Sequence, residues 1–589
     1  MKRKQPILWG SIMVLILLAL FNVMPTLTFA SSSEDIKWIS GTPVISKLRR
    51  QQKLLGKLPP PNFVFLRGLS WNEGDTLTFK TYNFNTNQSE DTPATLRKVD
   101  THCYIWVADD QWPPNGTRLG DTEDEAKNKV ETIGTEFDTN IYPNDRTYFG
   151  TEPNVDGDPR IHILVFDIKD GYTGIPPNDA YIAGYFDPAD QTGQNNLDMF
   201  YMDLDPGVAA SITFYGTLAH EFQHMIHYNM DTGHDEEDWF NEGLSDYAIL
   251  VCGYGLPNTH INAFATTPDV ALTDAFNNTF EEYGASFLFV EFMTELAERN
   301  GKTISDFTKA LVDEEDDGIN AINDVAPNFL PSEHDNFEKI FDAWVIANYL
   351  DSPTGTYGYR YPGLDFSVST EQVALNPLSN RTHTWEDQDV NSWAADYFEV
   401  EPTPSLFDLL LNFNGGISGI SPFDDFNDLQ VLVIKDGNLV GSPIPIGLNF
   451  LNDVNYTVTL RSYDQLVLVI SGNDDGGGYD LSVETPGVDV TLVIDRSGSM
   501  GWSQPDAPNG YIVPAKNAAT IASTTSLLLH LRYSDALTTS SSLFTTSAPR
   551  ETPIFLISDL FIPCTKCTKH INFITPSNPQ KAPRVYVHL

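Results

Sequence analysis

Two histidines and a glutamate with the spacing of a metal site lie near the middle of the chain. His220 and His224 are four residues apart, and Glu221 directly follows the first histidine. On a helix this spacing places both imidazoles on one face, one turn apart, where they can share a metal ion. Glu242 follows on what we expect to be the next helix. Two histidines and one carboxylate leave a fourth zinc position open for water, which is typical of a catalytic site.

A second acidic residue, one helical turn after Glu242, strengthens this interpretation. Asp246 is placed to accept the remaining ring N–H of a ligand histidine, which would fix the tautomer and the orientation of that ring. A lone pair of helical histidines is usually structural. The histidine pair together with Glu242 and Asp246 predicts a catalytic Zn²⁺ site.

His227 is a rival for the third ligand position, because residues 220, 224 and 227 share one helix face. The metzincin class of zinc proteases needs the pattern HExxHxxGxxH. In this chain His227 replaces the glycine of that pattern, and Met230 stands at the position of its last histidine. His227 would also sit a further turn from the metal, so we favour Glu242.

The segment 218–248, LAHEFQHMIHYNMDTGHDEEDWFNEGLSDYA, resembles the gluzincin class of zinc metallopeptidases, with a thermolysin-like set of ligands. Its sequence context is similar to the hyicolysin-like neutral zinc metallopeptidases. The resemblance covers residues 98–351 and is strong over 218–248. It implies that His220, His224 and Glu242 bind zinc, that Glu221 is the general base, and that Asp246 supports a ligand histidine.

The resemblance also implies a mechanism of peptide-bond hydrolysis. Zinc lowers the pKa of its bound water and polarises the scissile carbonyl, and Glu221 moves a proton from the water to the leaving amine. The oxyanion needs a further donor, which is a tyrosine or a histidine in related enzymes. Tyr283 and His260 are the candidates in this chain.

The elements expected around this site predict an α+β zincin catalytic domain over residues 71–360. Alternating and apolar runs predict strands, whereas capping residues and 3.6-residue periodicity predict helices. We expect Asp205 to cap the zinc helix, with Pro206 in its first turn. The expected strands are 76–82, 102–107 and 160–167, and the expected helices are 121–137, one opening at a capping box of Thr279 and Glu282, and 337–350.

Short strands separated by turn residues follow, and they predict an antiparallel β-sandwich as an accessory domain over residues 380–486. The last segment, 488–589, begins with an apolar strand and the sequence DRSGS. This start resembles a von Willebrand factor A domain, in which Asp495, Ser497 and Ser499 would bind Mg²⁺ or Ca²⁺. The family continues for longer than this segment, and the acidity of the chain reverses within it, so we interpret 488–589 as a truncated or frame-shifted, partial α/β domain.

The N-terminus has the pattern of a cleaved signal peptide over residues 1–30, which predicts a secreted protein. Residues 31–70 are polar and proline-rich, and we interpret them as a spacer or short pro-segment. The loop Asn154–Asp158 could hold calcium, although a turn rich in Asp and Gly explains it more simply. Cys103 and Cys252 could form a disulfide or remain buried thiols.

The net charge of −45 over 589 residues disfavours nucleic acid and anionic membranes as partners, and we expect no stable membrane insertion. The sequence thus predicts a secreted zinc endopeptidase that acts on proteins or peptides, with an extracellular protein partner for the A-type segment. Two alternatives remain open. One is a zinc aminopeptidase, although no GxMEN-type motif is present, and the other is a surface adhesion protein with a vestigial zinc site.

Overall fold

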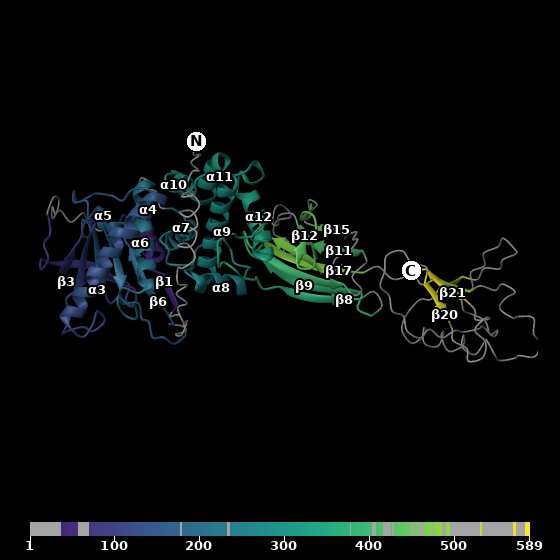
Figure 1. Ribbon diagram of the computed structural model, residues 1–589, viewed down its shortest axis with the longest axis horizontal. Helices are drawn as coiled ribbons and strands as arrows, with labels where there is room; N and C mark the ends of the chain where they lie inside the picture. Colours follow the sequence, from purple (N-terminus) through teal and green to yellow (C-terminus); the bar gives the residue numbers. More distant parts are fainter. Residues whose placement is uncertain are drawn as a thin grey trace, which may run out of the picture.

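The computed structural model of the protein describes residues 37–56, 70–176, 179–231, 236–376, 379–402, 408–415, 426, 429–448, 453–458, 465–474, 476–485, 491–494, 530–532, 569–572 and 584–588. The predicted signal peptide lies outside these residues. A mixed α+β region leads through a group of helices to a β-sandwich (Figure 1). No helix among the described residues is long and apolar enough to cross a membrane.

A seven-stranded sheet forms the first layer, in the order β1-β6-β7-β5-β4-β3-β2. Strands β4, β5 and β7 run parallel to one another, β6 is antiparallel to β7, and β1 pairs in parallel with β6 at the edge. The strands are β1 (Lys37–Ser40), β2 (Thr76–Asn83), β3 (Gln88–Val99), β4 (Cys103–Ala108), β5 (Ile161–Phe166), β6 (Ala180–Phe186) and β7 (Met199–Asp203).

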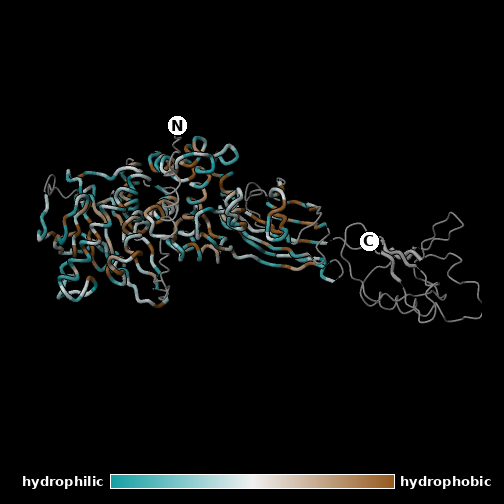
Figure 2. The backbone as a smooth tube through the Cα atoms, viewed as in Figure 1, coloured by the Kyte–Doolittle hydropathy of each residue, from teal (hydrophilic) through white to brown (hydrophobic). Residues whose placement is uncertain are grey.

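Both faces of this sheet are buried, which explains the continuous apolar runs of β4 and β5. Alternate side chains enter two cores: Ile105 and Ile163 face the large core that the helices share, whereas Trp106 and Leu164 face a smaller core on the other side. Hydrophobic segments accordingly lie inside the molecule and hydrophilic ones at its margins (Figure 2).

Helices cover the sheet and continue beyond it. They are α2 (Thr42–Leu54), α3 (Glu123–Glu136), the π-helical turn Phe137–Ile141, α4 (Tyr142–Tyr148), α5 (Ala189–Thr192), α6 (Ile212–Met230), α7 (Asp238–Val251), α8 (Asn258–Thr266), α9 (Phe280–Arg299), α10 (Ile304–Val312), α11 (Gly318–Phe329), the 3₁₀ turn Ser332–His334 and α12 (Phe337–Leu350). The predicted helices around 121–137 and 337–350 are present, and Thr279 and Glu282 form the expected capping box.

The predicted start of the zinc helix is wrong. Helix α6 begins at Ile212, and Ser211, not Asp205, caps it by accepting a hydrogen bond from the Phe214 N–H at 3.1 Å. The carboxylate of Asp203 accepts the backbone N–H groups of Ile168 and Gly207, which holds the chain after β7 in a loop. Pro206 therefore lies in this loop and not in a helix.

The interpretation of residues 31–70 as a spacer is wrong for residues 37–54. Residues 37–40 form strand β1 at the edge of the main sheet, and helix α2 follows directly. Ile45 of α2 is fully buried in the smaller core. Residues 37–54 are therefore an integral part of this fold.

Two facing sheets follow the helices, as the predicted β-sandwich requires. Their orders are β13-β12-β16-β10-β8, with β14 beside β12, and β15-β11-β17-β9. The strands are β8 (Glu371–Leu375), β9 (Thr382–Val390), β10 (Ala395–Pro402), β11 (Leu409–Asn414), β12 (Leu429–Lys435), β13 (Asn438–Leu439), β14 (Ile444–Ile446), β15 (Asp453–Val458), β16 (Gln465–Ser471) and β17 (Gly477–Glu484). Strand β8 pairs in parallel with β10, so the sandwich is not wholly antiparallel as predicted.

The described part of the C-terminal segment is a four-stranded sheet, in the order β19-β18-β21-β20. Strand β18 (Thr491–Ile494) coincides with the strand predicted before Asp495, and the others are β19 (His530–Arg532), β20 (Lys569–Asn572) and β21 (Arg584–His588). Asp495, Ser497 and Ser499 lie outside the described residues, so the A-type domain and its cation site stay predictions.

Candidate metal centre

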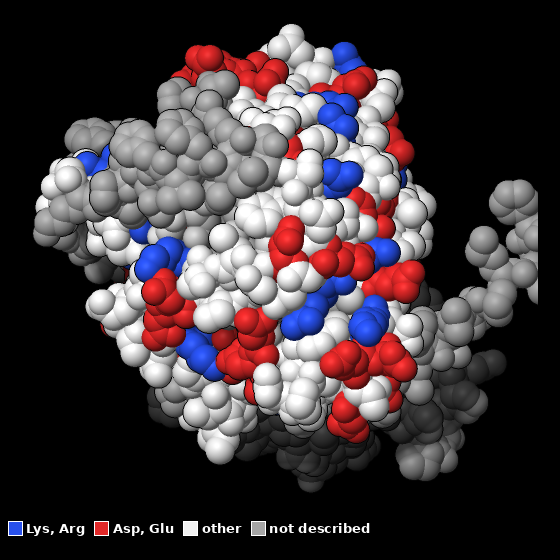
Figure 3. All heavy atoms as spheres, turned by 90° about the vertical axis from the view of Figure 1, so that its left-hand side faces the viewer, with Lys and Arg blue, Asp and Glu red and all other residues white. Residues whose placement is uncertain are grey.

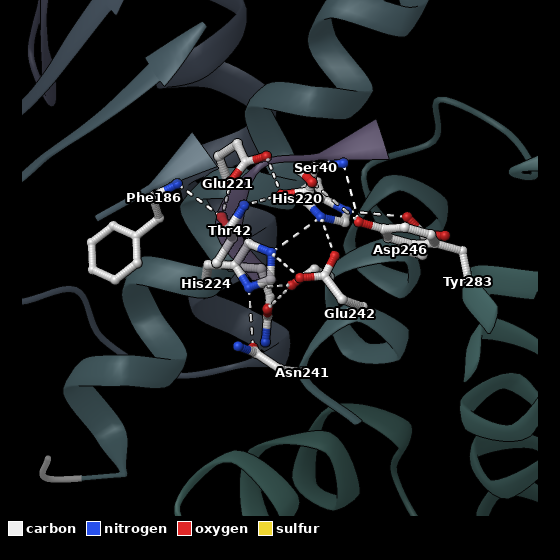
Figure 4. Close-up of polar contacts among 12 residues, drawn as sticks. Ser40, Thr42, Phe186, His220, Glu221, His224, Asn241, Glu242, Asp246 and Tyr283 are labelled. Carbon is white, nitrogen blue, oxygen red and sulfur yellow. Dashed lines mark hydrogen bonds and ion pairs between the residues drawn. The ribbon is translucent and has the colours of Figure 1, made fainter. Parts of the chain in front are cut away.

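Helices α6 and α7 carry the predicted metal ligands and pack against each other, and α6 also packs against β6 and β7 of the main sheet. His220, Glu221 and His224 project from α6, and Glu242 from α7, into one buried site (Figure 4). Gly184 of β6 allows α6 to lie close to the sheet, because a Cβ at this position would approach Tyr201 O to 2.8 Å and Glu221 Cγ to 2.9 Å. This close approach places the side chain of Glu221 against β6.

Three potential ligand side chains converge on one point. The Nε2 atoms of His220 and His224 are 3.1 Å apart, and the carboxylate oxygens of Glu242 lie 3.1 Å and 3.2 Å from them. Tetrahedral zinc with Zn–N distances of about 2.0–2.1 Å places neighbouring ligand atoms about 3.3 Å apart. Both the spacing and the two-nitrogen, one-carboxylate chemistry of this cluster therefore suit a zinc ion.

The other ring nitrogen of each histidine contacts an oxygen atom. His220 Nδ1 lies 3.1 Å from Asp246 Oδ1, and His224 Nδ1 lies 3.1 Å from Asn241 Oδ1 and 3.0 Å from Ser245 Oγ. An N–H at Nδ1 leaves the lone pair of Nε2 free, directed at the centre of the cluster. These contacts thus favour the tautomer that metal binding requires.

The pKa directions show which charges the cluster favours without a metal ion, and a metal ion that binds His220 would displace its second ring proton. Burial opposes a charge on His220, but Asp246 and Glu242 outweigh it and raise the pKa of His220 to about 10. Burial likewise opposes a charge on Glu242, but His224 and His220 lower the pKa of Glu242 to about 2. The cluster thus stabilises positive charge at its centre, where a metal cation would lie.

Glu221 lies beside the cluster but points to a different set of partners. Its carboxylate accepts hydrogen bonds from Ser40 Oγ and Thr42 Oγ1, each at 2.9 Å, and its side chain is fully buried. Burial raises the pKa of Glu221, while His220 and His224 act in the opposite direction. The sequence interpretation missed Ser40 and Thr42 because they are about 180 residues away in the chain.

His227 lies outside the converging cluster. Its Nδ1 is 3.1 Å from Asn241 Oδ1, its Nε2 is 3.7 Å from Glu236, and burial lowers its pKa to about 4. The residues that converge are His220, His224 and Glu242. The third member of this cluster is thus the residue that the sequence favoured over His227.

The two candidate oxyanion donors are buried next to the cluster and have protein partners. His260 Nδ1 contacts Asp246 Oδ2 at 2.8 Å, and its Nε2 lies 3.3 Å from the backbone oxygen of Trp38. The Tyr283 hydroxyl donates to Asn278 Oδ1 at 2.7 Å and accepts the Ser40 N–H at 3.1 Å. His260 therefore connects Asp246 to Trp38, and Tyr283 holds the backbone at Ser40.

Other features of the sequence contribute no residue to this site. Asp156 and Asp158 of the loop proposed for calcium contact His162 and Tyr104, respectively. Cys103 and Cys252 are separate buried thiols. Glu314, Asp316 and Asp324 form a further acidic group among the described residues, but it is mostly exposed.

Comparison with known proteins supports a metalloprotease. The chain is 28% identical over 331 residues to the neutral metalloprotease ShpI of Staphylococcus hyicus, an alignment that spans 51% of this chain and 69% of that protein. No protein-family profile matches the chain. A solved structure, the pre-peptidase C-terminal domain of a collagenase from Bacillus anthracis, matches 20% of this chain and 97% of its own length, with 13% identity and a TM-score of 0.13.

The metalloprotease relative and the converging cluster agree on the class of chemistry. The relative is named for metal-dependent proteolysis, and the cluster offers the ligand types that such chemistry uses.

Proposed function

We propose that the protein is a secreted, zinc-dependent endopeptidase. The observation that carries this proposal is the convergence of His220, His224 and Glu242 on one point, with the carboxylate of Glu221 beside it. Two imidazole nitrogens and one carboxylate would hold zinc and leave a position for water, and the related metalloprotease supports the same class of reaction.

The residues of the chain have distinct roles in this proposal. A zinc ion held by the cluster would polarise the scissile carbonyl and make water more acidic. Glu221 accepts a proton from water and delivers it to the leaving amine, since a carboxylate is a base at neutral pH and can carry a proton briefly. Asp246 orients His220, and Asn241 with Ser245 orients His224.

The proposal includes the further parts that the sequence suggests. Residues 1–30 would direct secretion, 71–360 would form the catalytic domain, 380–486 would be an accessory sandwich, and 488–589 would be a partial A-type segment with an extracellular protein partner. On the face drawn in Figure 3, Lys and Arg lie among Asp and Glu, so that this face offers no extended basic surface to nucleic acid. Peptides and proteins are the proposed substrates.

A direct test compares zinc content and peptide hydrolysis in one preparation. We would express residues 31–487 with a specific protease site between Gly56 and Lys57, and assay the intact and the cut protein with quenched peptides and casein. The cut form is included because Ser40 and Thr42 hold Glu221. We expect one zinc ion per chain and hydrolysis that a chelator abolishes.

The matched variants are Glu221→Gln and Glu298→Gln, the latter at an exposed position of α9. Glu221→Gln should retain zinc and lose hydrolysis, whereas Glu298→Gln should retain both. If the wild-type protein binds zinc but neither form cleaves any peptide, the proposal is wrong.

A further inference from the structure

The N-terminal segment passes directly over the proposed catalytic residues. Strand β1 lengthens the sheet at β6, with Trp38 opposite Tyr181 and Ser40 opposite Gly184. The Gly41 N–H then donates to Gly184 O at 2.9 Å before α2 begins. An unpaired strand edge is a binding site for an extended peptide. Residues 37–41 therefore use the sheet edge that lies nearest to Glu221.

Two hydroxyl groups of this segment occupy the carboxylate of Glu221. Ser40 Oγ donates to Oε1 and Thr42 Oγ1 donates to Oε2, both at 2.9 Å (Figure 4). Thr42 Oγ1 also accepts the N–H of Phe186 in β6. A general base must accept a hydrogen bond from the water that it activates. The two hydroxyls take the positions at which such a water would bind.

The same segment closes the site to a peptide. The Trp38 ring stands edge-on to His220, with ring centroids 5.9 Å apart. Glu221 and His220 have no exposed surface, and Glu242 has 1%. The cavity that reaches His224 has a volume of about 30 Å³ and is lined in part by Thr42, Ser46 and Arg50. Such a cavity holds a water molecule but no peptide.

Ion pairs connect helix α2 to Asp187, which follows β6, and to Asp238 of α7. The Arg49 guanidinium donates to both carboxylate oxygens of Asp187, a side chain with no exposed surface, and to Gln194 Oε1 at 2.9 Å. Arg50 pairs with Asp238 at the start of α7, at 2.6 Å. A bidentate pair to a buried carboxylate is costly to break, because it leaves the carboxylate without a counter-ion.

We propose that residues 37–54 are an inhibitory segment, which keeps the peptidase inactive until the chain is cut between α2 and β2. This inference rests on the proposed function, because it describes the control of the same site. Residues 55–69 connect this segment to the chain before β2, and residues 37–54 contain no cysteine that could cross-link them, so that one cut within 57–69 converts the segment into a peptide that can dissociate. Its departure frees Glu221 for water and the outer edge of β6 for a substrate strand.

The experiment uses the chain with the protease site between Gly56 and Lys57. Mass spectrometry follows the cut and the release of the N-terminal peptide, the rate of zinc removal by a chelator reports access to the metal, and a quenched peptide reports hydrolysis. We expect the released form to lose zinc to the chelator at least about tenfold faster and to gain hydrolysis. An Arg49→Ala variant, in which the cut peptide is held less firmly, provides a second route to release.

The outcomes separate this inference from the proposed function. Equal chelator rates and equal hydrolysis before and after release would overturn the inhibitory role and leave the peptidase intact. Faster zinc removal after release with no hydrolysis of any peptide would instead support the covering role of the segment while overturning the peptidase.

A synthetic peptide of residues 37–54 tests the contacts themselves. Added to the released enzyme, it should inhibit hydrolysis and slow zinc removal. The peptide with Ser40→Ala and Thr42→Ala should bind at least about 100-fold more weakly, because two hydrogen bonds to a charged group are lost. A peptide of the same composition in scrambled order is the control. Equal potency of all three peptides would contradict the proposal.

Discussion

At the scale of single residues, the metal site depends on the side chains that contact the proposed ligands and orient them. Asp246 has no exposed surface, and its two carboxylate oxygens lie 3.1 Å from His220 Nδ1 and 2.8 Å from His260 Nδ1. It therefore connects the metal cluster to the backbone of Trp38 through His260. Removing its charge should weaken metal binding without removing a ligand.

We predict that Asp246→Asn lowers zinc affinity roughly 10- to 100-fold, because His220 loses the charged acceptor that orients its ring. Competition with a fluorescent zinc chelator measures this affinity. Asp313→Asn, at an exposed position, should leave the affinity unchanged. The prediction fails if Asp246→Asn binds zinc as tightly as the wild type does.

The convergence of the cluster could be predicted because its members are close in sequence. Helical spacing fixes His220 against His224, and a short connection brings Glu242 alongside. Ser40 and Thr42 could not be found in this way, since a polar, proline-rich stretch does not reveal that a four-residue strand within it pairs with β6. The roles of these residues in metal binding and catalysis remain predictions.

At the scale of elements, local signals located the helices better than they located their ends. The capping box at Thr279 was visible in sequence, because its two residues act on each other. The start of α6 was not, because the loop that precedes it is held by Asp203 through backbone groups on two different segments. The short strands β13 and β14 were also missed, since two or three residues carry no periodicity.

Strand β10 carries a partly buried acid that makes stability depend on pH. Burial, reinforced by Asp269, raises the pKa of Asp396 to about 7, while the Tyr479 hydroxyl donates to it. The unfolded chain has a pKa near 4 for this group, so the folded state binds the proton more tightly. Its stabilising effect is complete below about pH 4 and is lost as the pH rises through 7.

We predict that Asp396→Asn, which keeps an acceptor for Tyr479, removes this dependence. From pH 5 to pH 8 the wild type should lose roughly 1–3 kcal/mol of unfolding free energy relative to the variant. Urea unfolding at both pH values measures the difference. Parallel changes in the two proteins would show that Asp396 does not ionise differently on folding.

At the scale of the whole molecule, the sandwich and the helices share one hydrophobic core. Trp393 packs against Phe337 and Phe341 of α12, and the Tyr397 hydroxyl donates to Val345 O at 2.8 Å. Val467 and Val469 of β16 belong to the same core. The sequence suggested a boundary near residue 360 because the composition changes there, but composition does not show which faces pack together.

A chain that ends at residue 360 should therefore be less stable than one that ends at residue 487, because it exposes the apolar face of α12. We expect the shorter chain to aggregate or to unfold at a lower temperature, as measured by size-exclusion chromatography and thermal unfolding. Equal unfolding temperatures and equal solubility would show that the sandwich is independent of the helices.

The most direct test of the account is the rate of peptide hydrolysis by the cut and released protein, at matched zinc content, for the wild type and Glu221→Gln. The account predicts that both bind one zinc ion and that the variant is slower by a factor on the order of 10² to 10⁴. Equal rates for the two proteins, or hydrolysis that persists after zinc removal, would contradict it.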